Sequence, residues 1–457
     1  MALVAVYTSA YSVYGLFRHW RFDSGAYDLG IFDQVIWHLS RFEAPASSIR
    51  GDASILGDHF SPVLILLVPA YWVAPRPEAL IVAQAALLTA SIVPVFLYAR
   101  QRLPTDTAYL FAAAYGLFWG IQRTAAFDFH EMAFAPLAVA VAILAVDASR
   151  WPLFWTMMVA LIGIKEDMIP LVGGFGLLLM LRGSVRHGIA AIILSCVAFW
   201  LVVGVIVPAM NTNGQFGYTE AYASVIHNPW RIPLEFVSPP TKLRTLAALL
   251  GSWLFLPLLS PLTLLAAPAV ATRFLSSSPN HWGVAFHYWA PVSPILAMAA
   301  ADGLARLTEW LRTRAADAPT VAVGRACAIV CLVACTIIPG HQPLLRLFRP
   351  STYEITATHQ TGHRAIRLIP RDASVVAQNA ILPHVSDRDQ VFLLRSGAID
   401  AEFVVASAQL DPWPLASVAE LRVLIDRYRM QSYEPVFDED GWIVLRRPRG
   451  RGPAMPR

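Results

Sequence analysis

The stretch ALIVAQAALLTASIVPVFLYAR, residues 79–100, carries no charged side chain before Arg100. About 20 such residues are enough for a helix to cross the hydrocarbon core of a bilayer. The whole chain has the same character, because 56% of its 457 residues are hydrophobic and only 14% are charged. Soluble domains carry about 25% charged residues. The composition therefore predicts a membrane protein and argues against a soluble enzyme or a disordered chain.

Similar apolar runs lie on both sides of this stretch and predict an all-α polytopic membrane protein with about eleven transmembrane helices. The run 60–75 is also apolar, but Pro62 and Pro69 interrupt it, so we expect a re-entrant or interfacial segment packed against protein. The expected spans are residues 2–17, 79–99, 107–122, 132–147, 151–164, 168–181, 188–209, 245–259, 261–275, 285–303 and 322–339.

The distribution of arginines favours an orientation with the N-terminus inside, because the short loops on that side then hold the higher density of basic residues. Arg18 and Arg21, just outside the first helix, count against it. In this orientation residues 1–341 form the membrane domain, and residues 18–78 form a large first outer loop. We therefore expect a multi-pass protein of the plasma membrane whose ionisable residues gather on the extracytoplasmic face.

The composition changes after residue 341, where residues 342–449 predict a small extracytoplasmic α/β domain. Residues 417–430 have helical spacing, and residues 436–447 predict a hairpin with its turn at Asp440-Gly441. Buried strands are expected at residues 374–378, 390–395 and 402–407. The Pro-, Arg- and Gly-rich tail, residues 450–457, is expected to be disordered.

The sequence gives no support for nucleic-acid binding or for a nucleotide-driven pump. The net charge is only +4, and no basic block stands out, so we expect no nucleic-acid binding. No Walker sequence, dinucleotide fingerprint or HExxH motif is present, which argues against a nucleotide-driven pump.

The segment YDLGIFDQVIWHL, residues 27–39, places two carboxylates in the first outer loop. Its apolar residues would let it lie as an amphipathic helix in the membrane interface. Asp28 and Asp33 would then be held at the membrane surface for chemistry. The alternative is an interfacial helix whose acids simply face water.

The motif GDHFSP, residues 57–62, precedes the interrupted apolar run. Asp58 and His59 can form an acid–imidazole pair or supply two metal ligands. The alternative interpretation is that Asp58 caps the turn that follows Gly57.

The motif FDFHE, residues 127–131, stands at the outer entrance of the fourth span. Ionisable residues beside an apolar helix are costly unless they are paired or functional. Asp128 and His130 could share a metal or hold a phosphate through a protonated imidazole, with Glu131 beside them. The alternative is a satisfied helix cap.

Three consecutive charges, Lys165, Glu166 and Asp167, separate two apolar runs. They could form a plain polar turn. Alternatively, Lys165 is aimed at a phosphate, with Glu166 or Asp167 orienting it.

The aromatic motif NHWGVAFHYW, residues 280–289, opens the tenth span. His281, His287 and Tyr288 could contact a sugar or a phosphate, since aromatic faces with polar tips suit a carbohydrate. The alternative is an aromatic belt at the membrane surface.

These motifs together resemble the family of polytopic bacterial and archaeal membrane proteins named after a domain of unknown function, DUF2079. The resemblance extends over about residues 20–450. That family in turn resembles the GT-C membrane glycosyltransferases, which take a sugar from a polyprenyl-phosphate donor. The motifs that carry the resemblance are YDLGIFDQ, GDHFSP, residues 79–100, FDFHE, KED and HYWAPVSPIL (287–296).

The resemblance implies a large first outer loop with an essential carboxylate and an outer C-terminal domain. Asp28 matches that carboxylate by position and is the candidate general base, with Asp33 and Asp58 as alternatives. The remaining motif residues are candidates for substrate binding: His59, Asp128, His130, Glu131, Lys165, Glu166, Asp167, His281, His287 and Tyr288.

We therefore expect an inverting membrane glycosyltransferase that acts on a cell-envelope glycan, a lipid or a protein. Lys165, His130, His287 or a divalent cation would neutralise the leaving phosphate. Candidate ligands for such a cation are Asp58, His59, Asp128 and His130.

The rival hypothesis is a transporter or flippase of a lipid-linked or small polar substrate, because intramembrane acids also mark ion paths. Transporters usually show two related halves, and no internal repeat is visible here. A third hypothesis is a scaffold protein whose outer domain binds a partner.

Overall fold

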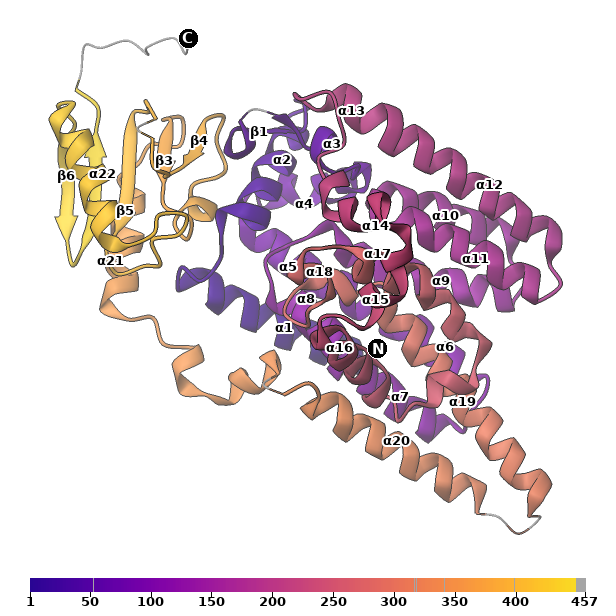
Figure 1. Cartoon of the computed structure of the whole chain (residues 1–457). Helices are drawn as coiled ribbons and strands as arrows, with labels where there is room; N and C mark the ends of the chain where they lie inside the picture. The colour runs from indigo at the N-terminus through magenta and orange to yellow at the C-terminus, as the bar shows by residue number, and fades with distance from the viewer. Residues whose placement is uncertain (52, 316, 318, 341, 398, 449–457) are drawn as a thin grey trace.

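The computed structural model describes residues 1–51, 53–315, 317, 319–340, 342–397 and 399–448. A large helical bundle occupies most of the molecule, and a small sheet lies at one end of it (Figure 1). The expected disorder of residues 450–457 falls outside the described residues.

The helices of the bundle follow the expected spans. Many of them have a proline in the first turn, where its fixed φ suits the helix and its missing N–H costs nothing. They are α1 (Ala2–Trp20), α5 (Pro77–Ala90), α6 (Ile92–Arg100), α7 (Thr105–Leu117), α8 (Trp119–Ala126), α9 (Ala135–Asp147), α10 (Trp151–Ile164), α11 (Ile169–Leu181), α12 (Val185–Leu201), α13 (Val207–Met210), α16 (Pro240–Gly251), α17 (Ala267–Leu275), α19 (Val292–Arg314) and α20 (Thr320–Ile337).

Three helical segments of the described chain are long and apolar enough to cross a membrane by themselves, namely Pro77–Arg100, Val185–Met210 and Thr320–Ile337. Other expected spans are shorter or broken. The span expected at 245–259 ends at Gly251, because Leu254 and Phe255 both adopt left-handed backbone angles. The bundle is that of a polytopic membrane protein, whereas the count of eleven crossings remains a prediction.

The first loop after α1 contains several short helices and two short strands. The helix expected over residues 27–39 begins only at Ile31, because an irregular turn precedes it. The loop contains α2 (Ile31–Ser40), the strands β1 (Ala46–Ser47) and β2 (Ala53–Ser54), α3 (Ile55–Asp58), the 3₁₀ segment Pro62–Leu67 and α4 (Val68–Val73). The interrupted apolar run 60–75 thus forms two short helical pieces, with α4 packed against α2.

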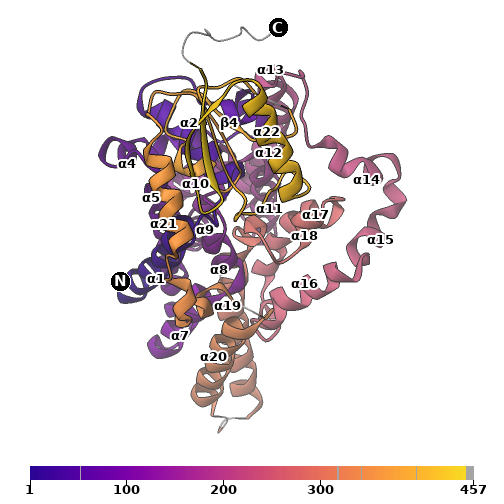
Figure 2. The ribbon, with the colours of Figure 1, turned by 90° about the vertical axis from the view of Figure 1, so that its left-hand side faces the viewer.

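Between α13 and α16 the chain forms an arm that stands away from the bundle (Figure 2). It contains α14 (Ala223–His227) and α15 (Ile232–Val237). The short helix α18 (Pro279–Trp282) follows α17 near the base of the arm.

The C-terminal sheet has five strands in the order β4-β3-β5-β7-β6. β3 runs parallel to both β4 and β5, and β7 pairs antiparallel with β5 and β6. The predicted strands, the helix and the turn are found, and Asp440 and Gly441 both have the positive φ that a tight hairpin turn requires. The elements are α21 (Ala357–Arg367), β3 (Val375–Ala377), β4 (Val391–Leu393), β5 (Phe403–Ser407), α22 (Val418–Met430), β6 (Glu434–Glu439) and β7 (Trp442–Arg446).

The sheet and the first loop share one apolar core. Phe22, Leu29 and Ile36 of the loop are buried with Leu382 and Trp442 of the C-terminal unit. The sheet is therefore packed directly on the segment that contains the candidate base, and Figure 1 shows the two side by side.

The packing of α3 against α13 depends on Gly57, which precedes the Asp58-His59 pair. A Cβ on Gly57 would overlap the carbonyl oxygen of Met210, and the Gly57 carbonyl accepts a hydrogen bond of 2.8 Å from Asn211 Nδ2. We expect Gly57→Ala to destabilise the folded protein by about 1–3 kcal/mol, the usual effect of overpacking. Thermal unfolding in detergent measures this. Gly217→Ala, where nothing lies within 4 Å, is the control. Equal unfolding temperatures for the two variants would contradict the close approach.

Candidate functional site

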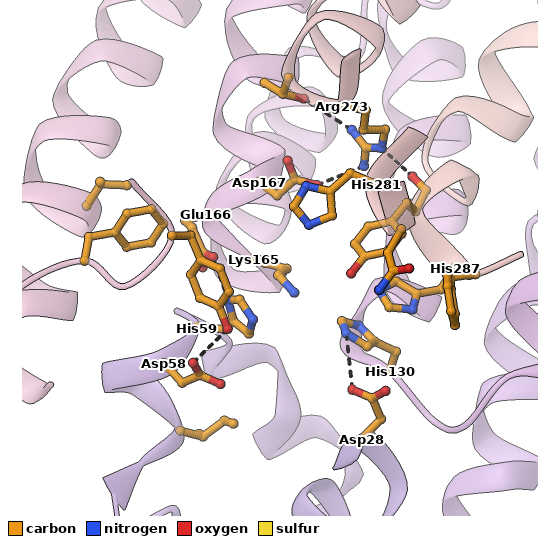
Figure 3. A pocket seen from close by; sticks show the side chains of 18 of the residues that line it. Asp28, Asp58, His59, His130, Lys165, Glu166, Asp167, Arg273, His281 and His287 are labelled. Carbon is orange, nitrogen blue, oxygen red and sulfur yellow. Dashed lines mark hydrogen bonds and ion pairs between the residues drawn. The ribbon is translucent and has the colours of Figure 1, made fainter. Parts of the chain in front are cut away.

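A cavity of about 540 Å³ opens where the first loop, the starts of several helices and the arm meet. Figure 3 shows Lys165 pointing into its middle, with His59 on one side and His130 and His287 on the other. Most of the residues singled out by the sequence line this cavity: Asp28, Asp58, His59, His130, Lys165, Glu166, Asp167, His281, His287 and Tyr288.

A buried chain of charges runs along one wall. Lys165 ends α10, and its Nζ lies 3.0 Å from Glu131 Oε1. Glu131 Oε2 lies 2.8 Å from His130 Nδ1, and the Glu131 side chain is fully buried. Burial disfavours the charged forms of Glu131 and Lys165, but the attraction of their charged and hydrogen-bonding partners outweighs this effect. The pKa of Glu131 is lowered by a hydrogen bond with His130 and by the charge of Lys165, and the pKa of Lys165 is raised by Glu131 and Glu166.

Lys165 is therefore a fixed cation at neutral pH. The sequence suggested Glu166 or Asp167 as the group that orients it; the structure adds Glu131 from the preceding motif as the ion-pair partner, while Glu166 acts on Lys165 through its charge. The plain polar turn is excluded, since Lys165 and Glu166 are both buried.

His130 and His287 stack face to face, with ring centroids 3.6 Å apart. Burial lowers the pKa of His130 to about 4 and that of His287 well below its usual value. The expected protonated imidazole at His130 is thus not supported. His130 also stands at the N-cap position of the 3₁₀ turn Glu131–Phe134, with its Nδ1 3.4 Å from the Met132 nitrogen. Neither ring nitrogen of His287 has a hydrogen-bond partner within the described part of the chain.

Asp28 lies in the irregular turn between α1 and α2 at φ 74° and ψ −90°. This left-handed backbone region is rare and strained for a residue other than glycine. The C-terminal unit stabilises this backbone conformation, because Asn379 Oδ1 accepts a hydrogen bond of 2.9 Å from the Ala26 N–H. Asp128 Oδ2 accepts from the Gly25 N–H at 2.8 Å on the same turn. The turn is thus fixed from two sides.

Asp28 has the environment of a weak acid that can change its charge near neutral pH. Burial, reinforced by the carboxylates of Asp128 and Glu131, raises the pKa of Asp28 to about 7. Its Oδ1 lies 3.9 Å from His130 Nε2, beyond hydrogen-bonding distance. Its side chain is 29% exposed, so it remains accessible from the cavity.

The opposite wall contains Asp58, His59 and Glu166. His59 Nδ1 lies 2.7 Å from Glu166 Oε1, so the acid–imidazole pair forms with Glu166 and not with Asp58. Asp58 ends α3 and does not cap it, since the cap is Ser54. Asp58 is held by Arg50 at 2.5 Å and by the Tyr218 hydroxyl at 2.9 Å.

Two cations of this cavity, Arg50 and Arg273, were not predicted from the sequence. Arg273, near the end of α17, is 2% exposed and donates to Asp167 Oδ2 at 2.9 Å and to the Tyr288 carbonyl at 2.6 Å. The available signal was its position as a single arginine in the apolar run 261–275. His281 lies nearby, with Nδ1 2.7 Å from Ser276 Oγ.

Three candidate residues do not line the cavity. Glu131 lies behind Lys165, as described above. Asp128 pairs with Arg18 at 2.8 Å behind the Asp28 turn. Asp33, an alternative base, is fully buried and accepts hydrogen bonds from Tyr71 and from Ser386 Oγ, the latter at 2.7 Å. Its carboxylate joins α2 to the C-terminal unit and cannot reach a substrate in the cavity.

The carboxylates of the cavity do not fit a divalent cation. Glu166, Asp167 and Asp58 each already contact a basic side chain. Among the described residues, the proposed ligands Asp58, His59, Asp128 and His130 do not bring three ligand atoms within 4.8 Å of one another. Lys165 and Arg273 supply the positive charge instead.

One wall of the cavity is apolar and faces the outside of the bundle. Phe199 and Val203 line it from the helical segment Val185–Met210. Only 17% of the most apolar part of that segment is buried, and Phe199 is 53% exposed. The cavity therefore joins a polar, charged interior to a surface suited to lipid.

Comparisons with known proteins agree with this architecture. The family described as "Predicted membrane protein (DUF2079)" matches residues 18–444. Two similar solved structures are of ArnT from Cupriavidus metallidurans. The one bound to undecaprenyl phosphate has a TM-score of 0.56 at 12% identity, with 99% of each chain covered. The apo state has a TM-score of 0.54 at 12% identity, with 97% of each chain covered. No curated protein sequence matches the chain at a significant level. The chain therefore shares the polytopic GT-C fold of these ArnT structures.

The pairing of Lys165 with Glu131 can be tested by a double-mutant cycle. Glu131→Gln leaves a buried cation without its partner and is expected to destabilise the protein by about 3–5 kcal/mol. Lys165→Met should destabilise the protein by a similar amount. The double variant should lose much less stability than the sum of the two single losses, as judged by unfolding in detergent. Asp106→Asn, which breaks an exposed pair with Arg325, should hardly change stability. Additive losses in the cycle would contradict the pairing.

Proposed function

We propose that the chain, which belongs to the DUF2079 family of predicted membrane proteins, is a membrane glycosyltransferase. It moves a sugar from a polyprenyl-phosphate donor to a hydroxyl of an extracytoplasmic glycan, lipid or protein. Asp28 is the general base, and Lys165 stabilises the leaving phosphate.

One observation carries this proposal. Asp28, whose pKa is about 7, and Lys165, a fixed cation, open into the same cavity. Glycosyl transfer needs both groups, because a base must take the proton of the acceptor while a cation stabilises the charge that develops on the leaving group. Catalytic acids and bases are tuned toward the working pH in this manner.

The apolar wall supports a lipid-linked donor. Phe199 and Val203 offer a path along which a polyprenyl chain can remain in the bilayer while its phosphate reaches Lys165 and Arg273. The similar fold of ArnT, solved with undecaprenyl phosphate, supports the same class of lipid. Because that likeness stands at 12% identity, it supports the fold and leaves the sugar and the acceptor open.

The reaction is a single displacement. The acceptor oxygen forms a bond to the anomeric carbon while its proton passes to the Asp28 carboxylate. The bond between that carbon and the phosphate oxygen breaks, and its electron pair leaves with the phosphate. The products are the glycosylated acceptor and polyprenyl phosphate, and the anomeric configuration is inverted. The neutral His130–His287 stack lines the cavity beside Asp28, where it can accept hydrogen bonds from sugar hydroxyls.

The C-terminal unit supports the chemistry from behind. Asn379 and Ser386 hold the backbone turn of Asp28 and the carboxylate of Asp33. In the proposed orientation this unit and the cavity both lie on the extracytoplasmic side. Its role is therefore to fix the position of the base.

Replacement of the base tests the proposal. Asp28→Asn should lower sugar transfer from a lipid-linked donor to background, since the amide cannot take a proton, while the protein still folds and inserts. Transfer of radiolabelled sugar in reconstituted vesicles measures this, and Glu43→Gln in the same loop is the matched control. Wild-type transfer by Asp28→Asn would exclude Asp28 as the base, and absence of transfer by the wild-type protein with every polyprenyl-phosphate sugar would count against the enzyme.

The pH dependence provides a separate test. The base must be deprotonated, so kcat/KM should rise with pH and level off above about 7, the pKa of Asp28. Below that value each pH unit removes about nine-tenths of the reactive carboxylate. Lys165 stays protonated and His130 stays neutral over this range, so neither adds a second step. A profile that is flat between about pH 5.5 and 8 would contradict the assignment.

A further inference from the structure

A second cavity, of about 550 Å³, lies beside the first and plays no part in the proposed reaction. The two share the Phe127 side chain. Five arginines and a single acid, Asp23, are among the residues that line it. The arginines are Arg18, Arg21, Arg123, Arg346 and Arg349.

Within the described part of the chain, two of these arginines, Arg346 and Arg349, have no carboxylate partner. Asp23 is already paired with Arg21 at 2.9 Å, and Arg18 is paired with Asp128. Among the described residues, no carboxylate lies within ion-pair distance of Arg346 or Arg349. The Arg346 guanidinium donates to the Tyr14 hydroxyl at 3.4 Å. Several guanidinium groups are thus gathered where a bound anion would offset their mutual repulsion.

The cavity lies where two helices of the bundle end. It is built from the C-terminal ends of α1 and α8 and from the segment that follows α20. That segment, PLLRLFR (343–349), places Leu345 and Phe348 on the surface, 44% and 82% exposed, between its arginines. Exposed apolar side chains that alternate with arginines are typical of a segment lying in the membrane interface, where the cations meet phosphate groups.

We propose that this second cavity binds a phosphate group, held by Arg346 and Arg349 together with the arginines of α1 and α8. Guanidinium groups suit this ligand because each offers paired donors in the plane of two phosphate oxygens. The exposed Leu345 and Phe348 favour a phospholipid headgroup as the source, with the acyl chains beside them. A free phosphorylated compound offers the same chemistry. The site is independent of the proposed sugar transfer.

Binding can be measured on the purified full-length protein by native mass spectrometry. Wild-type protein titrated with phosphatidylglycerol should retain this lipid about tenfold better than phosphatidylcholine, whose headgroup carries no net charge. Arg346→Gln/Arg349→Gln should lose that preference, since each charged hydrogen bond to phosphate contributes about 1.5–3 kcal/mol, or roughly tenfold or more in affinity. Arg422→Gln, on the exposed side of α22, is the control for a general loss of positive charge.

A second arm separates the lipid from a free phosphate. Inorganic pyrophosphate is added to protein in phosphatidylcholine nanodiscs, and binding is followed by thermal unfolding. Stabilisation that depends on Arg346 and Arg349, without a preference for phosphatidylglycerol, assigns the site to a free phosphate.

The main cavity also contains cations, so Glu131→Gln/Lys165→Met, which removes both charges of the buried pair, is measured alongside and should retain the binding. If both probes bind equally to wild type and to Arg346→Gln/Arg349→Gln, or bind to neither, the proposal is overturned. Without ligand, equal unfolding temperatures of the wild-type protein and of Arg346→Gln/Arg349→Gln show that this double variant is folded.

Discussion

The buried ion pair between Lys165 and Glu131 is the constraint on which the site depends. A charge in an apolar bundle is tolerated only with a partner, so the loop after α10 and the loop before α9 must meet. Once they meet, His130 is drawn against Glu131, and His287 stacks on His130. The cation that would stabilise a leaving phosphate is thereby also the group that brings the walls of the cavity together.

A second constraint comes from the far end of the chain. The C-terminal unit packs on the first loop, where Asn379 accepts a hydrogen bond from the Ala26 N–H and Ser386 donates one to Asp33, on either side of Asp28. A residue with φ 74° keeps that conformation only when its surroundings impose it. The position of Asp28 therefore depends on residues more than 350 positions away. The resulting site has one ionisable carboxylate at the cavity, whereas the others are fixed in pairs.

Much of the fold and part of the site could be predicted because membrane physics leaves strong local signals. Apolar runs gave the helices, and charged residues beside them marked Lys165, His130 and Asp28. The ion-pair partners of these residues could not be predicted. A motif shows which charged side chains need a partner of opposite charge, but it does not show which residue supplies that charge. Lys165 was matched to its sequence neighbours, but its partner lies 34 positions earlier. Arg273 was overlooked because a single arginine in an apolar run has no periodicity.

The sequence by itself determined that this chain is a membrane protein, where its helices and C-terminal strands lie, and which family it belongs to. The membrane character and the elements follow from local composition and period, whereas the family follows from the motifs and their order. Asp28 and Asp33 lie in one short motif. Only the tertiary structure decided that Asp33 is buried and hydrogen-bonded to the C-terminal unit, whereas Asp28 faces the cavity. The reason is that burial and backbone angle are set by what packs on a segment, and here the packing partner is the distant C-terminal sheet.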